Sequence, residues 1–328
     1  MNNMASLFLN PKLYDKDIEQ IPTRNGYGDA LVELGKTRKD VFVLTGDLAE
    51  STRANLFQKA YPDRFVECGV AEQNMMGIAA GMALSGATPF VSSYAVFVPG
   101  RCWDQLRVSV AYSNANVKVA GAHSGISVGP DGATHQALED IAITRVLPGM
   151  TVVVPCDYEE TRKATIALAN MKGPAYFRFA REKTAVITTT KTPFEIGKAN
   201  VLATGKDVTI VACGPLVYEA LMAAKQLEAK GISCEVINSH TIKPLDIATI
   251  TKSVKKTGCC VTVEEHQITG GLFGAVAEGL ARTFPIPIEA VGMPDSFGES
   301  GEPSELLKKY GMTDKAIVKA ALKSLKRK

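Results

Sequence analysis

The sequence predicts an α/β protein of two domains, each a mainly parallel β-sheet covered by helices. Short apolar, β-branched runs alternate with segments of helical periodicity along most of the chain. Continuous apolar strands separated by helices are typical of parallel sheets that are buried on both faces. A segment with neither pattern divides the chain, and 328 residues are enough for two domains of ordinary size.

The first domain is predicted to span residues 1–182. Its apolar runs are predicted as strands at 41–46, 65–68, 88–93, 117–122, 151–155 and 175–180. Helical patterns lie between them at 24–38, 97–112 and 157–170. Strands joined in this way by helices run in the same direction, so we expect a parallel sheet.

Residues 183–195 are predicted as a linker, because they combine charges, a Thr run and a proline without helical periodicity. The second domain, residues 196–328, repeats the alternation. Its predicted strands lie at 208–214, 234–239, 259–265 and 286–292, and its predicted helices at 216–230, 245–255 and 271–282.

The composition excludes several classes of protein. The net charge is only +3, and its excess lies in the Lys-rich end of the chain, which argues against a nucleic-acid-binding surface. No apolar run is long enough to span a bilayer, and no secretory segment opens the chain. The seven cysteines form no CxxC pair. We therefore expect a reduced, cytoplasmic protein without a metal site of its own.

A single acid, Glu72, opens the most informative segment, residues 68–83. Small and apolar residues follow it at helical spacing, and the glycines among them lower helix stability by roughly 1 kcal/mol each. Such glycines suggest that another helix approaches closely, as at an interface. An acid in a first helical turn is also commonly a surface residue that complements the helix dipole, so both interpretations stay open at this point.

Other polar and aromatic side chains follow the predicted strands at the points where the strands end. These are Ser51, Glu72, Tyr94, Phe97, Arg101, His123, Asp131, His135 and Arg181. Ligands of open parallel sheets bind at the carboxyl ends of the strands, so we expect these side chains to gather at one edge. Their chemistry indicates a pocket for a polar, anionic substrate beside an aromatic slot.

A second glycine-rich segment, residues 270–278, follows a predicted strand and opens a helix. Its helix N-terminus could bind a phosphate group. More often such glycines allow a tight turn and close packing of helix on sheet, and we favour that interpretation.

Three segments of the first domain carry a resemblance to a known family: DRFVECGVAEQNMMGIAAGMA, PFVSSYAVFVPGRCWDQLR and AGAHSGISVGPDGATHQALEDIAITRVLPGMTVVVP. They resemble the pyrimidine-binding domain of transketolases. The second domain, with VEEHQITGGLFGAVAE, is similar to the C-terminal domain of that family. The whole chain resembles the C-terminal half of a transketolase, in the form in which the enzyme is split into two polypeptides.

The family's diphosphate-binding domain carries a GDG motif followed by a distal Asn, and this chain has no matching segment. The resemblance therefore implies an N-terminal partner subunit that binds the diphosphate of thiamine diphosphate together with Mg²⁺ or Ca²⁺. The cofactor would be shared between the two chains, and this chain alone would be inactive.

The resemblance assigns the cofactor contacts to four residues. The counterpart of Glu72 hydrogen-bonds a ring nitrogen of the aminopyrimidine, which favours the imino tautomer that removes the thiazolium proton. Tyr94 and Phe97 resemble the aromatics that pack against the pyrimidine, although either Phe97 or Val98 could face the ring. Arg101 is placed with them as a cofactor contact.

The resemblance assigns the substrate contacts to five residues. His135 and Asp131 resemble residues that bind sugar hydroxyl groups, and His135 is also expected to take part in catalysis. His123 matches a histidine that the family keeps near the substrate. Arg181, with Ser51, resembles the clamp for the phosphate end of a sugar phosphate.

The implied activity is transfer of a two-carbon ketol unit between sugar phosphates, as in the pentose phosphate pathway, by a heterotetramer with two copies of each subunit. Alternatives remain open: an enzyme like 1-deoxy-D-xylulose-5-phosphate synthase, the beta subunit of a 2-oxo acid dehydrogenase, or a non-catalytic binding or regulatory subunit. The synthase is normally one long chain. The dehydrogenase acts on no sugar, which would leave the Asp131 and His135 pair without a purpose.

Overall fold

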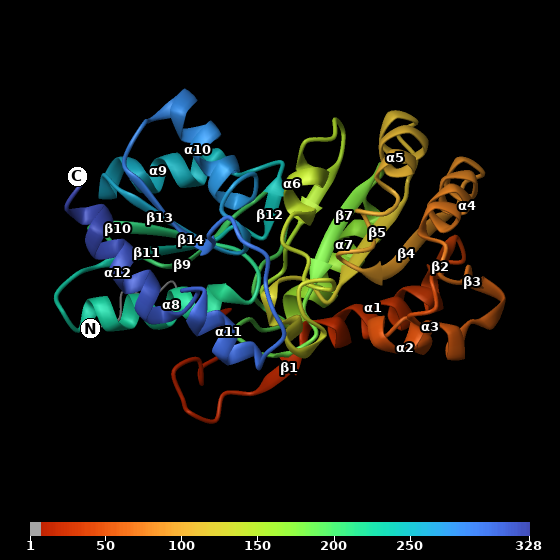
Figure 1. The fold of residues 1–328 in the computed structure, drawn as a ribbon, viewed down its shortest axis with the longest axis horizontal. Helices are drawn as coiled ribbons and strands as arrows, with labels where there is room; N and C mark the ends of the chain where they lie inside the picture. Colours follow the sequence, from red (N-terminus) through yellow and green to blue (C-terminus); the bar gives the residue numbers. More distant parts are fainter. Residues whose placement is uncertain (1–7) are drawn as a thin grey trace.

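The computed structural model describes residues 8–328 and contains two large β-sheets side by side (Figure 1). The first has seven strands in the order β12-β6-β7-β5-β4-β2-β3, and the second has five in the order β14-β13-β10-β11-β9. Within each sheet all pairings are parallel except those of the edge strands β12 and β9. The predicted α/β fold with two mainly parallel sheets is confirmed.

The first sheet forms the centre of the N-terminal domain. Its strands are β2 (Val41–Thr45), β3 (Phe65–Glu67), β4 (Thr88–Tyr94), β5 (Lys118–Ala122), β6 (Thr151–Val153), β7 (Ala175–Phe179) and β12 (Thr241–Lys243). The first six coincide with the apolar runs of the sequence. The interior strands β4 and β5 are buried along nearly their whole length, which is why apolar and small residues dominate both of them in the sequence.

Helices cover both faces of this sheet (Figure 1). One face packs against α1 (Thr23–Thr37), α3 (Asn55–Ala60) and α7 (Tyr158–Asn170), and the short α2 (Ala49–Thr52) precedes α3. The other face packs against α4 (Glu72–Leu84), the π-helix η3 (Leu106–Tyr112) and α6 (Asp140–Arg145).

The helix predicted over 97–112 begins later than expected. The structure has a turn from Ala95 onward, and the helix starts with α5 (Trp103–Gln105), which continues into η3. Pro99 explains the difference, because a proline lacks the backbone N–H and disfavours the helical conformation of the residue before it.

The second sheet forms the centre of the C-terminal domain. Its strands are β9 (Asn200–Ala203), β10 (Val208–Ala212), β11 (Cys234–Asn238), β13 (Cys260–Gln267) and β14 (Ile288–Met293). Helices α8 (Leu216–Glu228) and α12 (Asp314–Leu325) cover one face, and α9 (Ile247–Thr257) and α10 (Leu272–Thr283) cover the other. Helix α11 (Pro303–Lys309) packs against the N-terminal domain at the short helix η4 (Ile126–Asp131).

The two domains are joined by more than a linker. Strand β12 follows the second sheet's β11 in sequence but pairs with β6 of the first sheet. Strand β1 (Gln20–Pro22) pairs with β8 (Lys183–Ala185), so the first residues of the predicted linker are a strand. A shared hydrophobic core also contains side chains of both domains. Among the helices of residues 8–328, none combines the length and apolar character that crossing a membrane requires.

Candidate active site

Glu72 is the first residue of α4, and only 4% of its surface is exposed. The turn before it depends on Gly69, whose φ of +68° is a conformation that favours glycine. The Arg101 Nη1 atom donates a hydrogen bond to Glu72 Oε1 at 3.0 Å. A buried, ion-paired carboxylate does not fit the interpretation of Glu72 as a solvated surface residue at a helix start.

Aromatic rings cluster beside this ion pair. The Tyr94 and Phe97 rings stack with centroids 5.6 Å apart, and Arg101 lies over the Phe97 ring at 3.8 Å. The His135 ring meets the Phe97 ring edge-on at 5.4 Å. Val98 is fully buried in the hydrophobic core, so the structure places Phe97, and not Val98, in the ring cluster.

His123 follows β5 directly and stacks on Tyr94 with centroids 4.1 Å apart. Its Nε2 atom lies 3.1 Å from both the Ser51 carbonyl oxygen and the Arg24 Nη1 atom. Burial, with Arg24 and Arg181 nearby, lowers the pKa of His123 to about 3, so the ring is neutral at physiological pH. Its Nδ1 atom is buried and has no hydrogen-bond partner among the described residues.

Arg24 is a residue of this cluster that the sequence did not reveal. It lies in the first turn of α1, and its Nη1 atom donates to the Ser51 carbonyl oxygen at 2.9 Å. Its Nε atom is buried without a partner in the described part of the chain. Burial and the neighbouring Arg53 and Arg181 lower the pKa of Arg24, which marks an electropositive pocket. The pairing of β1 with β8 brings Arg24 here, and no local signal in the sequence shows that pairing.

The second cationic side chain, Arg181, comes two residues after β7. Its Nη1 atom donates to Asp131 Oδ1 at 3.1 Å. Asp131 ends helix η4, and the half-buried His135 lies four residues further on, with its Nδ1 atom 2.8 Å from Thr134 Oγ1. Asp131 is therefore already engaged by Arg181 rather than free.

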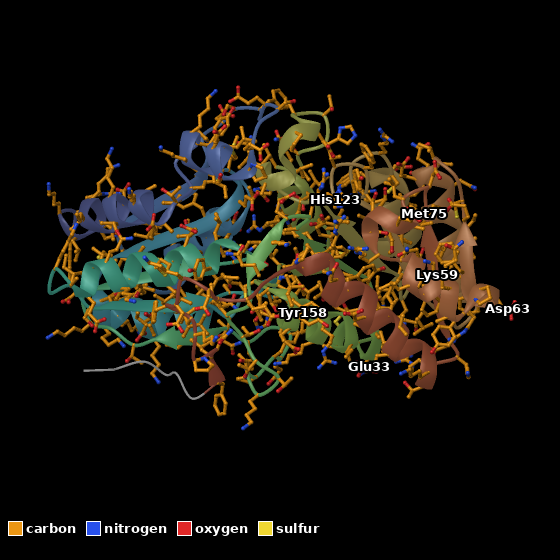
Figure 2. The ribbon with its side chains drawn as sticks, turned by 90° about the horizontal axis from the view of Figure 1, so that it is seen from below. Glu33, Lys59, Asp63, Met75, His123 and Tyr158 are labelled. Carbon is orange, nitrogen blue, oxygen red and sulfur yellow. The ribbon has the colours of Figure 1, made fainter. Side chains whose placement is uncertain are left out.

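The structure brings the predicted site residues together at the carboxyl edge of the first sheet. Ring contacts, an ion pair and a hydrogen bond join seven of them into one cluster: Glu72, Arg101, Phe97, Tyr94, His135, His123 and Ser51. The ion pair of Arg181 with Asp131 lies next to His123. Ser51 takes part through its backbone carbonyl. In Figure 2, His123 lies nearer to the C-terminal domain than Met75 of α4 does. Within residues 8–328, no group of His, Cys, Asp and Glu side chains could hold a metal ion.

The arrangement has three chemical parts. A buried carboxylate ends an aromatic slot, which suits a flat heteroaromatic ring with a hydrogen-bonding nitrogen. The imidazole rings of His123 and His135, with Asp131, offer donors and acceptors to hydroxyl groups. Arg24 and Arg181 offer guanidinium groups, which bind phosphate bidentately.

The glycine-rich segment 270–278 has a structural role instead of a phosphate site. The Glu264 carboxylate accepts hydrogen bonds from the backbone N–H groups of Leu272 at 2.6 Å and Phe273 at 2.8 Å. A Cβ atom on Gly271 would lie 2.0 Å from this carboxylate, so glycine is required for the close approach. The favoured interpretation, a tight turn with close packing, agrees with these contacts.

The fold and the site define a two-domain α/β protein with a polar and aromatic cluster at the strand ends of its first sheet. The model of the transketolase pyrimidine-binding domain matches residues 19–186, and that of the transketolase C-terminal domain matches residues 197–317. The chain therefore belongs to the transketolase family, which depends on thiamine diphosphate.

Relatives of similar length support this assignment. A solved structure of a split gene transketolase, described as an inactive β4 tetramer, is 44% identical with a TM-score of 0.87, over 94% of this chain and 100% of that one. The 6-deoxy-6-sulfo-D-fructose transketolase subunit SqwH of Clostridium sp. (strain MSTE9) is 40% identical over 96% of this chain and 98% of its own length. One of the subunits of the apulose-4-phosphate transketolase of Phocaeicola vulgatus is 40% identical over 94% of this chain and 98% of its own length.

Proposed function

We propose that this chain is the C-terminal subunit of a split transketolase. It transfers a two-carbon ketol unit from a ketose phosphate to an aldose phosphate, and it acts only with an N-terminal subunit that binds the diphosphate of thiamine diphosphate and its Mg²⁺ or Ca²⁺ ion. The observation that carries the proposal is the buried Glu72 beside an aromatic slot, in a chain that matches relatives named as transketolase subunits over nearly their whole length.

The residues present fit the pyrimidine half of the cofactor. Tyr94 and Phe97 would pack against the ring, and Arg101 holds Glu72 beside them. Glu72 would hold or share a proton with a ring nitrogen, because a carboxyl group donates a hydrogen bond when protonated and accepts one when ionised. When bound, thiamine diphosphate supplies the electron sink that cleavage of a carbon–carbon bond next to a carbonyl group requires.

The residues on the other side of Tyr94 fit a sugar phosphate. His135, neutral His123 and Asp131 would bind and orient hydroxyl groups, and His135 would move a proton at the reacting hydroxyl. The unpartnered Nε of Arg24 and the guanidinium group of Arg181 would bind the phosphate end. Two relatives are named as subunits of transketolases for 6-deoxy-6-sulfo-D-fructose and apulose 4-phosphate, so the proposal names the class of sugar phosphates and no individual donor or acceptor.

The assembly we propose has two copies of each subunit and two active sites. The proposal is tested by measuring ketol transfer between sugar phosphates with the purified chain, with the purified N-terminal subunit, and with their mixture. Activity is expected in the mixture alone. Ketol transfer by the purified chain without its partner would refute the split-site proposal.

A further inference from the structure

The loop of residues 124–136 carries Asp131 and His135, and the C-terminal domain holds this loop at two places. All residues assigned to the cluster belong to the N-terminal domain, so the cluster itself gives the C-terminal domain no role. The contacts of the 124–136 loop indicate a role for the C-terminal domain, which is to hold this loop in position.

The first contact is made by Glu265 on β13. Its side chain is 6% exposed, and its Oε1 atom accepts a hydrogen bond from the Ser127 backbone N–H at 2.6 Å. Gly125 has a φ of +83°, and a Cβ atom there would lie 2.3 Å from Glu265 Oε1. The loop backbone therefore packs directly against the carboxylate, which only glycine permits.

The second contact is made by residues 297–303, between β14 and α11. The Gln136 Nε2 atom donates to the Glu299 carbonyl oxygen at 2.9 Å. A Cβ atom on Gly132 would lie 2.6 Å from Ser300 Oγ, and one on Gly129 would lie 3.0 Å from Pro303. Asp131 lies between these points of close approach, so its position is fixed from both sides.

Glu265 also touches the strand that leads to Arg181. The buried Arg178 on β7 donates from Nη2 to the Glu265 carbonyl oxygen at 3.0 Å and from Nη1 to Asp140 Oδ1 at 2.9 Å. Glu265 thus contacts the loop of Asp131 through its side chain, and the Arg178 side chain, three residues before Arg181, through its backbone carbonyl. Replacement of the Glu265 side chain keeps this carbonyl, so loss of the carboxylate should be felt first in the loop, where the Ser127 N–H loses its acceptor.

We propose that Glu265 is a positioning residue that sets the geometry of Asp131 and His135 relative to Arg181. Through it, the C-terminal domain controls how well the site recognises a polyhydroxylated sugar phosphate. The expected effect of Glu265 on substrate recognition rests on the function proposed above. The contact by which Glu265 fixes the loop does not depend on that function.

The test compares Glu265→Ala with wild type by two measurements. Hydrogen exchange of the 124–136 amides is measured on the full chain by itself. Michaelis constants for the donor sugar phosphate and the affinity for thiamine diphosphate are measured on the complex with the N-terminal subunit. Loss of a hydrogen bond to a charged group is expected to raise both the exchange rates and the donor Michaelis constant by about tenfold or more. The affinity for thiamine diphosphate should be unchanged.

Two further variants separate positioning from general damage. Glu265→Gln keeps an oxygen that can accept from Ser127 and should restore most of the protection and the donor Michaelis constant. Glu219→Ala removes another glutamate of the C-terminal domain, which accepts from the Asp314 N–H, and should leave both quantities as in wild type. If Glu265→Ala does not fold, Glu265→Asp, which withdraws the carboxylate by one methylene group, is measured in its place.

The proposal is overturned if loop exchange and the donor Michaelis constant keep their wild-type values in Glu265→Ala. It is equally overturned if the affinity for thiamine diphosphate falls in parallel, or if Glu219→Ala has the same effect. Failure of the wild-type complex to transfer a ketol unit would refute the proposed function alone, because the exchange measurement needs no activity.

Discussion

At the scale of single residues, burial and charge act together on Glu72. The side chain is almost fully enclosed, yet Arg101 supplies a cation 3.0 Å away, and Arg101 itself is held over the Phe97 ring. An ion pair whose arginine lies over the Phe97 ring keeps the carboxylate in one place beside the ring cluster.

We predict that Glu72→Gln lowers the turnover of the reconstituted enzyme by a factor of about 10²–10⁴, because an amide cannot relay a proton. The fold should be retained, since Gln fills the same space. Ketol-transfer rates and circular dichroism of both proteins check this. Glu33→Gln, a surface glutamate paired with Arg162, is the matched control and should be fully active. Normal turnover in a folded Glu72→Gln enzyme would remove Glu72 from the mechanism.

We predict that Arg181→Ala raises the Michaelis constant for phosphorylated sugars about 10- to 150-fold, since a hydrogen bond to a charged group contributes roughly 1.5–3 kcal/mol. Unphosphorylated sugars should be affected far less. His135→Ala should impair the use of both kinds of substrate alike, because the His135 side chain is proposed to bind hydroxyl groups, which both kinds carry. Michaelis constants of both variants, measured with one phosphorylated and one unphosphorylated sugar, test these expectations. Equal losses on both substrates in Arg181→Ala would contradict a phosphate-binding role.

At the scale of elements, the sequence predicts the long buried strands well but does not predict the short strands β1, β8 and β12. Apolar and small residues dominate strands such as β4 and β5 because both faces of the sheet are covered. Strands β1, β8 and β12 have three residues each, and their partners lie far away in the sequence. Tertiary packing, not local pattern, forms them. The place of Arg24 in the site could not be predicted for the same reason.

The N-terminus of α10 provides a prediction on pH dependence. Burial raises the pKa of Glu264 to about 8 from its ordinary value of 4.5, although two backbone N–H groups favour its charged form. Between these pH values the folded protein keeps a proton that the unfolded chain has lost. This group therefore stabilises the fold fully below about pH 4.5, and that stability is lost as the pH rises toward about 8.

We predict that Glu264→Gln shows a smaller decline in the free energy of unfolding from about pH 5 to about pH 8, because the amide does not titrate. Its overall stability should be lower by about 1 kcal/mol, since one N–H loses its acceptor. Urea unfolding at both pH values measures this. Glu278→Gln, an exposed position on the same helix, should keep the slope of wild type. An unchanged slope in Glu264→Gln would mean that Glu264 does not titrate with folding.

At the scale of the whole molecule, helix α4 presents a face that the described chain leaves uncovered. Val70 before the helix is 69% exposed, and Ile78 and Leu84 are 36% and 66% exposed. A Cβ atom on Gly77 or Gly81 would meet nothing within 4 Å, so crowding inside the domain does not explain these glycines. The sequence indicated a helix-packing face here, and an interface with another chain would provide the partner.

We predict that Gly81→Leu causes the assembly to dissociate and lose activity while the chain keeps its secondary structure. No contact within the chain is disturbed, so the effect must come from a neighbouring chain. Light scattering and circular dichroism test this together. Lys319→Leu, which adds the same side chain to the exposed face of α12, is the control and should assemble normally. An intact, active assembly of Gly81→Leu would refute an interface at α4.

The sequence alone also indicates the functional class, because the segments around Glu72, Tyr94 and His135 are long and specific. It could not show that Asp131 is engaged by Arg181, or that Glu265 supports the loop between them. Those contacts join segments that only the packing of two domains brings together.

On the proposed function, this chain supplies the pyrimidine side of a thiamine diphosphate site and a second subunit supplies the rest. Calorimetric titration of thiamine diphosphate with Mg²⁺ tests this division of the site most directly, using the chain alone, the N-terminal subunit alone and their equimolar mixture. We predict tight, saturable binding of one cofactor per pair of chains in the mixture and none of comparable strength in this chain alone. Tight stoichiometric binding by this chain without its partner would contradict this division of the site.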